Sequence, residues 1–472
     1  MMDATPATNL NAAPTPGART ASSAATSERM SPSELPATST DSGLNPPGQG
    51  RIPAAHASFF RQSGWLMISQ IAGGMLMWGL HFLPTAFQKV HGTSFPKGEY
   101  GVFGSYLALL MLLPDLPLQM VLAQQTARAL ASGNQRQLSG IIRRFWLALL
   151  LVWLAAAVAL AIRQPWVLAH YQLPGATGLW LTMFAALLSL WMPMFGGVMQ
   201  GQQNFLWYGW NQIINGIGRV GIAFLAVLAF RASSTGMMAG ALIGLVAATA
   251  LPAWQTLPLW KLRPEPANWR NLLDQILPLI IGFIGFKILF MADTIFVKGN
   301  FSGAEADFYT GAGTLSRALM WLVLPLAAVM FPKLVHSAAK SEKTNLMGIV
   351  FGGTAVLAIG GVVFFWVVRY WLVRIYPAEY RDVIYHLLPW YSSAMVPLAL
   401  ANVLLNNMLA RPASKLPAAL CILGLSIGYL FALHYAVQAS HHLETVLKTM
   451  GLCNLILMGV CAGFTWLVKK DT

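Results

Sequence analysis

The sequence predicts an all-α polytopic membrane protein with about twelve transmembrane helices in two six-helix lobes that form a parallel repeat. Three observations predict this fold class. Of the 472 residues, 56% are hydrophobic and only 10% are charged, whereas a soluble globular protein carries about 25% charged residues. Long apolar runs follow one another from Phe59 onward, and two stretches of the second half resemble stretches of the first.

The apolar runs have the length of membrane-spanning helices. A helix needs about 20 mostly apolar residues to cross the hydrocarbon core, and its backbone must form its hydrogen bonds internally. A β-barrel would instead show alternating segments of about ten residues, which this sequence lacks. We expect spans at 62–85, 100–123, 145–163, 175–199, 210–230, 236–258, 272–297, 307–331, 346–368, 384–408, 416–437 and 444–467.

Residues 1–58 differ from the rest of the chain, because stretches such as NAAPTPGARTASSAATS offer nothing for a packed core. We expect a disordered cytoplasmic tail, which lacks the apolar region of a signal peptide. Twelve spans place both termini on one side, where the loops carry fourteen Lys and Arg against eight on the other side. Cytoplasmic loops collect basic residues. We therefore expect a multi-pass protein of the cytoplasmic (inner) membrane with both termini cytoplasmic. These loops also account for the net charge of +14, so no nucleic acid partner is expected.

The repeat appears in two pairs of segments. With Tyr100 aligned to Tyr309, EYGVFGSYLALLMLLPDLPL faces DFYTGAGTLSRALMWLVLPL, and WMPMFGGVMQGQQ faces MVPLALANVLLNN with Pro193 opposite Pro397. Both copies begin on the same side of the membrane, so they are parallel repeats about an axis along the membrane normal. We expect an N-terminal lobe at 59–260 and a C-terminal lobe at 261–472.

Two charges interrupt the apolar stretch FKILFMADTIFVKGN. Lys287 lies near the middle of its span and cannot extend its ammonium to the interface, so it should face protein or water. We expect it to hold an anionic cargo group, such as a diphosphate or an acidic sugar. Asp293 lies about 8 Å from the outer end of the helix at 1.5 Å per residue. It is either a structural carboxylate or a coupling group that binds H⁺ or Na⁺.

Two arginines are further candidates for cargo binding. Arg219 shares a helix face with Gln212 and Asn215, and a polar stripe on a spanning helix must face the protein interior. Arg317 lies in the eighth span. An arginine suits two-pronged contact with phosphate or carboxylate, although an ion pair between helices is the alternative for both.

Asp115 stands between Pro114 and Pro117 in the second span. Prolines remove backbone hydrogen bonds and kink a helix, and broken helices at matching places in two repeats indicate a transporter site. Pro325 in the eighth span is the matching position. Asp115 is therefore a second candidate for ion coupling, the alternative being a carboxylate that satisfies groups freed by the kink.

Four amides near inner helix ends could hydrogen-bond a sugar: Gln202, Gln203, Asn406 and Asn407. The group His441, His442 and Glu444 has too few ligands for a metal site, and the three cysteines lie in apolar segments without metal spacing. We expect neither a metal nor a cofactor.

These features resemble the polysaccharide and oligosaccharide-lipid exporters of the multidrug/oligosaccharidyl-lipid/polysaccharide superfamily over about residues 60–470. The resemblance is carried by EYGVFGSYLALLMLLPDLPLQMVLAQQTARALASG, FGGVMQGQQNF and MADTIFVKGNFSGAEADFYTGAGTLSRALMWLVLPLAAVMFPKL. It implies two lobes around a central cavity that opens alternately to either side, with a lipid-linked or polymeric sugar as cargo. The long N-terminal tail is not part of the family pattern. The first span has no acidic residue, which disfavours the drug/cation antiporter branch.

We therefore expect a flippase or exporter rather than an enzyme, with membrane lipids and envelope polysaccharide assembly proteins as neighbours. A membrane-embedded sugar polymerase or ligase is the alternative, but its acid/base motifs are missing. No GxxxxGK[ST] motif is present, so an H⁺ or Na⁺ gradient is the expected energy source. A structural subunit would gain nothing from charges held in lipid.

Overall fold

The computed structural model of the chain describes residues 54–340, 346–410 and 415–470. The predicted tail, 1–58, lies outside the described residues except for 54–58, which are already helical as the start of α1 (Ala54–Trp78). Ala54–Thr472 forms one compact unit by its internal contacts. This unit is described below.

The secondary structure of the described residues is helical, with no strand among them. The first half of the chain contains α1, η1 (Gly79–Phe82), α2 (Leu83–His91), α3 (Glu99–Met111), α4 (Asp115–Ala131), α5 (Gln135–His170), α6 (Ala176–Gly201), α7 (Phe205–Ala229) and α8 (Ser234–Lys261). The second half contains α9 (Trp269–Asn300), α10 (Gly303–Lys340), α11 (Leu346–Leu372), η2 (Val373–Ile375), α12 (Ala378–Ala410), α13 (Lys415–Ala439) and α14 (Leu443–Lys470).

Every predicted span falls on one helix or on two or three consecutive helices. Among the described residues, ten helical segments are long and apolar enough to cross a membrane, with α3 and α4 counted as one segment. The two remaining predicted spans fall on α1 with its continuation through η1 and α2, and on α10. The prediction of an all-α polytopic membrane protein is therefore confirmed.

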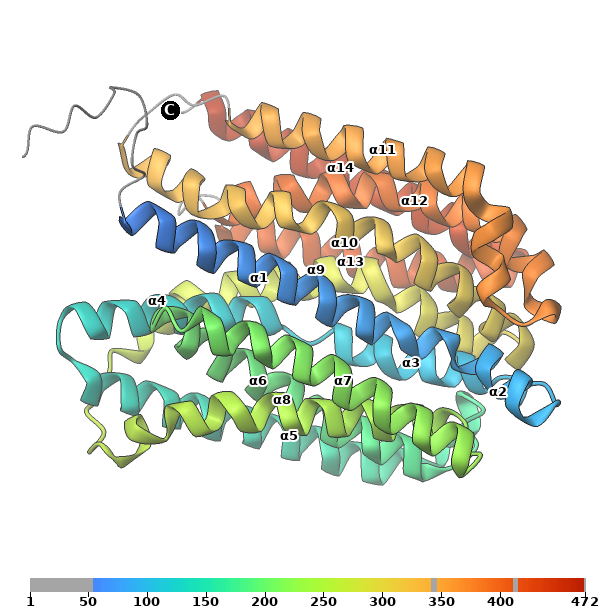
Figure 1. Cartoon of the computed structure of the whole chain (residues 1–472). Helices are drawn as coiled ribbons and strands as arrows, with labels where there is room; N and C mark the ends of the chain where they lie inside the picture. The colour runs from blue at the N-terminus through green and yellow to red at the C-terminus, as the bar shows by residue number, and fades with distance from the viewer. Residues whose placement is uncertain (1–53, 341–345, 411–414, 471–472) are drawn as a thin grey trace, which may run out of the picture. The chain divides into compact units, whose positions relative to one another are not determined.

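The two halves repeat the same packing partnerships. In each half the first span packs on the fifth, as α1 on α7 and α9 on α13. The second packs on the fourth, as α4 on α6 and α10 on α12, and the fourth on the sixth, as α6 on α8 and α12 on α14. Figure 1 shows the blue-to-green helices of the first half beside the yellow-to-red helices of the second. The exact lobe boundaries, 59–260 and 261–472, stay predictions.

The second span is broken where the sequence contains two prolines. Helix α3 ends at Met111 and α4 begins at Asp115, because Pro114 and Pro117 each lack the N–H that a continuous helix needs. Pro114 adopts φ −81° and ψ 65°, an inverse γ-turn in which the Asp115 N–H donates to the Leu113 carbonyl at 2.9 Å. The expected matching break at Pro325 is wrong, since α10 is helical through that residue. A membrane-spanning helix can continue through a proline when neighbouring groups form hydrogen bonds with the backbone carbonyl that the proline leaves without a donor.

The halves approach each other closely where α3 crosses the start of α10. A Cβ atom on Gly101 would lie 2.8 Å from the Ala306 Cβ, and one on Gly98 would lie 3.1 Å from the Gly303 Cα. Gly98 also has a φ of +82°, which L side chains rarely adopt. Small residues therefore permit this crossing, as at many helix contacts within membranes.

Candidate functional site

Lys287 of α9 occupies the break between α3 and α4. Its Nζ donates to the Leu113 carbonyl oxygen at 2.6 Å and forms an ion pair with the Asp115 carboxylate. The Leu113 carbonyl would bond to residue 117 in a continuous helix, but Pro117 has no N–H. The oxygen accepts from the Asp115 N–H instead and can accept a second hydrogen bond. The sequence "LPDLP" thus creates an acceptor in the middle of a span, and a lysine from the second half of the chain fills it.

The pair between Lys287 and Asp115 is unevenly exposed. The Lys287 side chain is 15% exposed and the Asp115 side chain 54%. Asp115 also accepts from the Leu116 backbone N–H at 2.7 Å. It therefore satisfies one backbone donor at the kink, which is the alternative role predicted for it. About half of the Asp115 side chain is left exposed beside the ion pair.

Asp293 and Arg317 pair with each other rather than standing apart. The Arg317 Nη2 lies 2.7 and 2.8 Å from the two Asp293 oxygens, and the hydroxyls of Tyr309 and Tyr391 also donate to Asp293. Arg317 further donates to the Phe290 carbonyl at 3.1 Å. The Asp293 side chain is 0% exposed. The arrangement on α9, α10 and α12 is that of a satisfied ion pair between helices, the alternative that the sequence left open for both residues.

Arg219 of α7 has no carboxylate partner among the described residues. No ion pair includes it, and its Nε is buried without a hydrogen-bond acceptor in the described part of the chain. One turn earlier on the same face, the Asn215 side-chain oxygen is also buried without a described donor. Helix α7 also contacts η1, the short helix that contains His81. The face of α7 that contains Asn215 and Arg219 therefore combines a cation without an ion-pair partner with an amide oxygen without a hydrogen-bond donor, among the described residues.

His81 was not among the residues that the sequence indicated. It lies in η1, where the first span changes from an α-helix to a 3-10 helix, and its Nδ1 is 2.7 Å from the Tyr100 hydroxyl. The Thr314 hydroxyl of α10 lies 3.5 Å from the same nitrogen. The feature of the sequence that could have indicated His81 is its position inside a predicted span, 62–85. Its position links α3, α7 and the second half.

The four predicted amides do not form one site. Gln202 caps the C-terminus of α6, and Gln203 has a left-handed φ of 57° in the turn that follows. Asn406 is buried and donates to the Asn402 carbonyl at 2.8 Å. Asn407 is buried in α12 with its Nδ2 unpaired among the described residues. Asn407 therefore keeps a free donor, whereas Gln202 and Gln203 lie in a helix-ending turn.

A second buried carboxylate, Asp307 of α10, was also missed. It accepts from the Gly98 and Gly101 backbone N–H groups at 2.7 and 2.6 Å and from the Tyr380 hydroxyl at 3.0 Å. The acidic-aromatic pair that begins this span was its sequence signal. What the sequence could not show is that the carboxylate reaches a helix of the other half.

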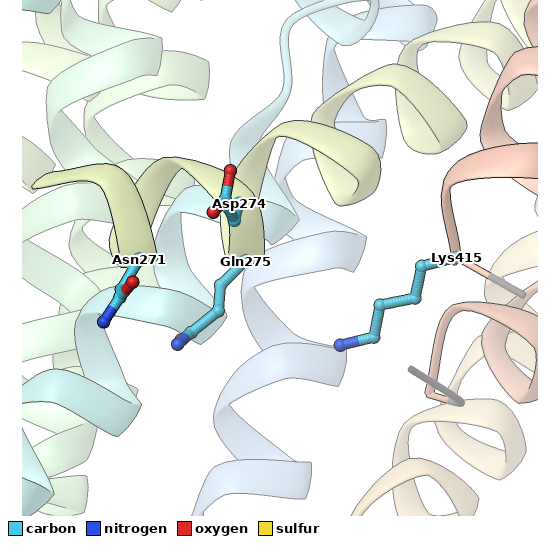
Figure 2. Close-up of a pocket in the computed structure, with 4 residues that line it drawn as sticks. All are labelled: Asn271, Asp274, Gln275 and Lys415. Atoms are coloured by element: carbon cyan, nitrogen blue, oxygen red, sulfur yellow. The ribbon is translucent and has the colours of Figure 1, made fainter. Parts of the chain in front are cut away.

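A polar pocket of about 360 Å³ lies at the start of α9 and α13, away from these charges. It is lined by Asn271, Asp274, Gln275 and Lys415. In Figure 2, Lys415 extends from α13 toward α9, where Asn271 and Gln275 point downward and Asp274 points the opposite way. None of the predicted site residues lines this pocket, so it is not the site that the sequence indicated.

The sequence from residue 95 to residue 337 matches the family model described as "Polysaccharide biosynthesis protein". No curated protein matches the chain. Among solved structures, an inward-facing multidrug resistance MATE family transporter of the MOP superfamily aligns with a TM-score of 0.64 and 13% identity, covering 84% of this chain and 93% of that one.

Two further structures share the arrangement of helices. The lipid II flippase MurJ, in an inward closed conformation, aligns with a TM-score of 0.63 and 12% identity over 88% of each chain. A MATE transporter from Vibrio cholerae aligns with a TM-score of 0.52 and 15% identity, over 86% of this chain and 98% of that one. At these identities the likeness establishes the fold.

Proposed function

Because the chain belongs to the polysaccharide biosynthesis protein family, we propose that it flips a lipid-linked oligosaccharide, or exports a polysaccharide, across the cytoplasmic membrane. The MOP-superfamily fold and the paired halves support alternating access as the mechanism. In this mechanism the two halves move against each other around cargo bound between them. The orientation is the one that the loop charges indicate, with both termini cytoplasmic.

The observation that carries this proposal is the unpaired guanidinium of Arg219. An arginine at the centre of a spanning helix costs roughly 2.5–3.5 kcal/mol on insertion scales. The Asp293 carboxylate offsets this cost for Arg317, but no described carboxylate does so for Arg219. A fixed, unpaired cation in the interior is explained by an anionic cargo group that completes the pair during transport.

Lys287 is the second cation that we assign to the cargo. It lies at the contact between the halves, and its Asp115 partner is half exposed. A diphosphate or an acidic sugar that approaches Lys287 can replace Asp115 as its partner, because both are anions. We assign Arg317 to the fold instead. Asn407, with a free amide donor, is the best placed of the four amides to bond a sugar.

Ion coupling fits Asp115 better than Asp293. Asp293 is enclosed by Arg317 and two tyrosine hydroxyls and has no exposed surface. Asp115 is 54% exposed and shares its charge partner with the cargo. When the cargo takes Lys287, the released carboxylate can bind H⁺ or Na⁺. One such ion crossing the membrane gains about 2.3 kcal/mol per 100 mV.

The test is translocation of a labelled lipid-linked oligosaccharide in proteoliposomes. Arg219→Gln and Lys287→Gln should each lower the rate at least about tenfold while the protein stays folded. Arg128→Gln, which removes an exposed arginine from the last turn of α4, is the matched control and should keep the parent rate. Parent rates in both Arg219→Gln and Lys287→Gln would overturn the proposal.

The same reconstitution separates the alternatives. A drug/cation antiporter should accumulate a cationic dye, which the unpaired Arg219 charge in the interior disfavours by repulsion. A membrane-embedded polymerase or ligase should change the length or linkage of the sugar. We expect the sugar to be recovered chemically unchanged on the opposite leaflet.

A further inference from the structure

Helix α3 is capped at its N-terminus by a carboxylate from the other half of the protein. Asp307 of α10 accepts hydrogen bonds from the Gly98 and Gly101 backbone N–H groups at 2.7 and 2.6 Å. The N-cap residue, Gly98, makes no side-chain cap of its own. The first N–H groups of a helix have no partner within the helix. Asp307, which is fully buried, therefore replaces the local side chain that usually caps a helix.

The opposite end of α3 is held by a cation, again from the second half. Lys287 of α9 donates to the Leu113 carbonyl oxygen, two residues beyond the last helical residue, Met111, at 2.6 Å. Helix dipoles favour an anion at the N-terminus and a cation at the C-terminus. Both ends of α3 thus receive the charge that stabilises them, and both charges come from across the contact between the halves.

The close packing of α3 on α10 adds to the hold at the N-terminal end. A Cβ on Gly101 would lie 2.8 Å from the Ala306 Cβ. If α3 and α10 separate there, two backbone N–H groups lose their acceptor, and a buried carboxylate loses two of its three donors and keeps only Tyr380 of α12. Separation at this end is therefore opposed until water or another partner reaches Asp307.

We propose that α3 is the gate of the transporter, and that Asp307 at its N-terminal end and Lys287 at its C-terminal end together hold it closed toward the side of the 92–98 loop. The part assigned to Lys287 rests on the proposed function, because an anionic cargo that draws Lys287 away from Leu113 removes the C-terminal cap. A helix of 13 residues spans about 20 Å. Cargo at one end of α3 thus weakens the clamp at the other end.

Accessibility of a half-buried position beyond the gate, Thr314, tests this proposal. Thr314 lies seven residues after Asp307 on α10, about 10 Å deeper at 1.5 Å per residue, and its hydroxyl lies near His81. Thr314→Cys is introduced after replacing the three cysteines at 421, 453 and 461 with Ala. A membrane-impermeant maleimide is then added, without cargo, to vesicles of both orientations.

Asp307→Asn and Lys287→Gln should each raise the Thr314→Cys labelling rate at least about threefold, from the side of the 92–98 loop only. Tyr380→Phe, which removes one donor and no charge, should give a smaller rise in the same direction. Glu305→Gln is the matched control, because Glu305 is an acidic residue two positions before Asp307 whose carboxylate accepts, among the described residues, only from Ser302. It should label at the parent rate.

An unchanged labelling rate in Asp307→Asn, or in Lys287→Gln, would overturn the clamp. Because no cargo is added, this result is independent of the translocation assay. If the cargo assignment is wrong, the labelling rates should still rise in these variants. If the clamp is wrong, Arg219→Gln and Lys287→Gln should still lower the translocation rate. If Asp307→Asn does not fold, Tyr380→Phe and Lys287→Gln decide the outcome.

Discussion

The Arg317 guanidinium nitrogen lies 2.7 and 2.8 Å from the two carboxylate oxygens of Asp293, in a site with almost no exposed surface. The pair joins α9 to α10, and the hydroxyls of Tyr309 and Tyr391 complete the hydrogen bonding of Asp293. A charge that is fully satisfied inside the protein is poorly placed to bind cargo or ions. We therefore assign Asp293 and Arg317 to the stability of the fold. Arg219, Lys287 and Asp115 remain the charged residues that we assign to transport.

Breaking the structural pair should destabilise the fold. Asp293→Asn and Arg317→Gln each leave one partner unbalanced, which costs about 3–5 kcal/mol for a buried ion pair. Thermal unfolding in detergent should show a lower Tm for each single variant. The double variant should lose less than the sum of the two, because no unpaired charge remains. Additive losses would contradict a direct pair.

Asp115→Asn should separate ion coupling from folding. The side chain is 54% exposed, so its replacement should leave the Tm near that of the parent. Translocation driven by an imposed pH or Na⁺ gradient should fall to the rate seen without a gradient. Asp274→Asn, at an exposed acidic position of α9, is the control. Gradient-driven transport at the normal rate in Asp115→Asn would remove this carboxylate from coupling.

Gly101→Ala should keep the two halves apart at the crossing of α3 and α10. The added methyl group meets the Ala306 Cβ at 2.8 Å and its carbonyl carbon at 2.9 Å, both attached to backbone that cannot easily move. We expect translocation to fall at least about fivefold with normal membrane insertion. Gly74→Ala, where nothing lies within 4 Å of the added Cβ, should transport as the parent does. Equal rates in the two variants would mean that the crossing can relax.

The sequence predicts much of this fold because lipid leaves few alternatives. Each apolar run must become a helix, and Pro114 and Pro117 break the second span as expected. The sequence could not predict which charged residues inside the membrane pair with each other. Lys287 and Asp293 are six residues apart and point to different faces, so each takes a partner from another helix. Their partners, Asp115 and Arg317, are 172 and 24 residues away, and only helix packing brings them together.

Interior cations that recognise an anionic headgroup should distinguish two cargo analogues that differ only in charge. Purified protein is titrated with a diphosphate-linked lipid oligosaccharide and with a matched analogue whose linkage carries no charge. A hydrogen bond to a charged group contributes about 1.5–3 kcal/mol, which corresponds to at least about tenfold in affinity. The parent protein should prefer the charged analogue by at least that factor, and Arg219→Gln should lose most of the preference. Equal affinities for the two analogues in the parent, or an unchanged preference in Arg219→Gln and Lys287→Gln, would contradict the account.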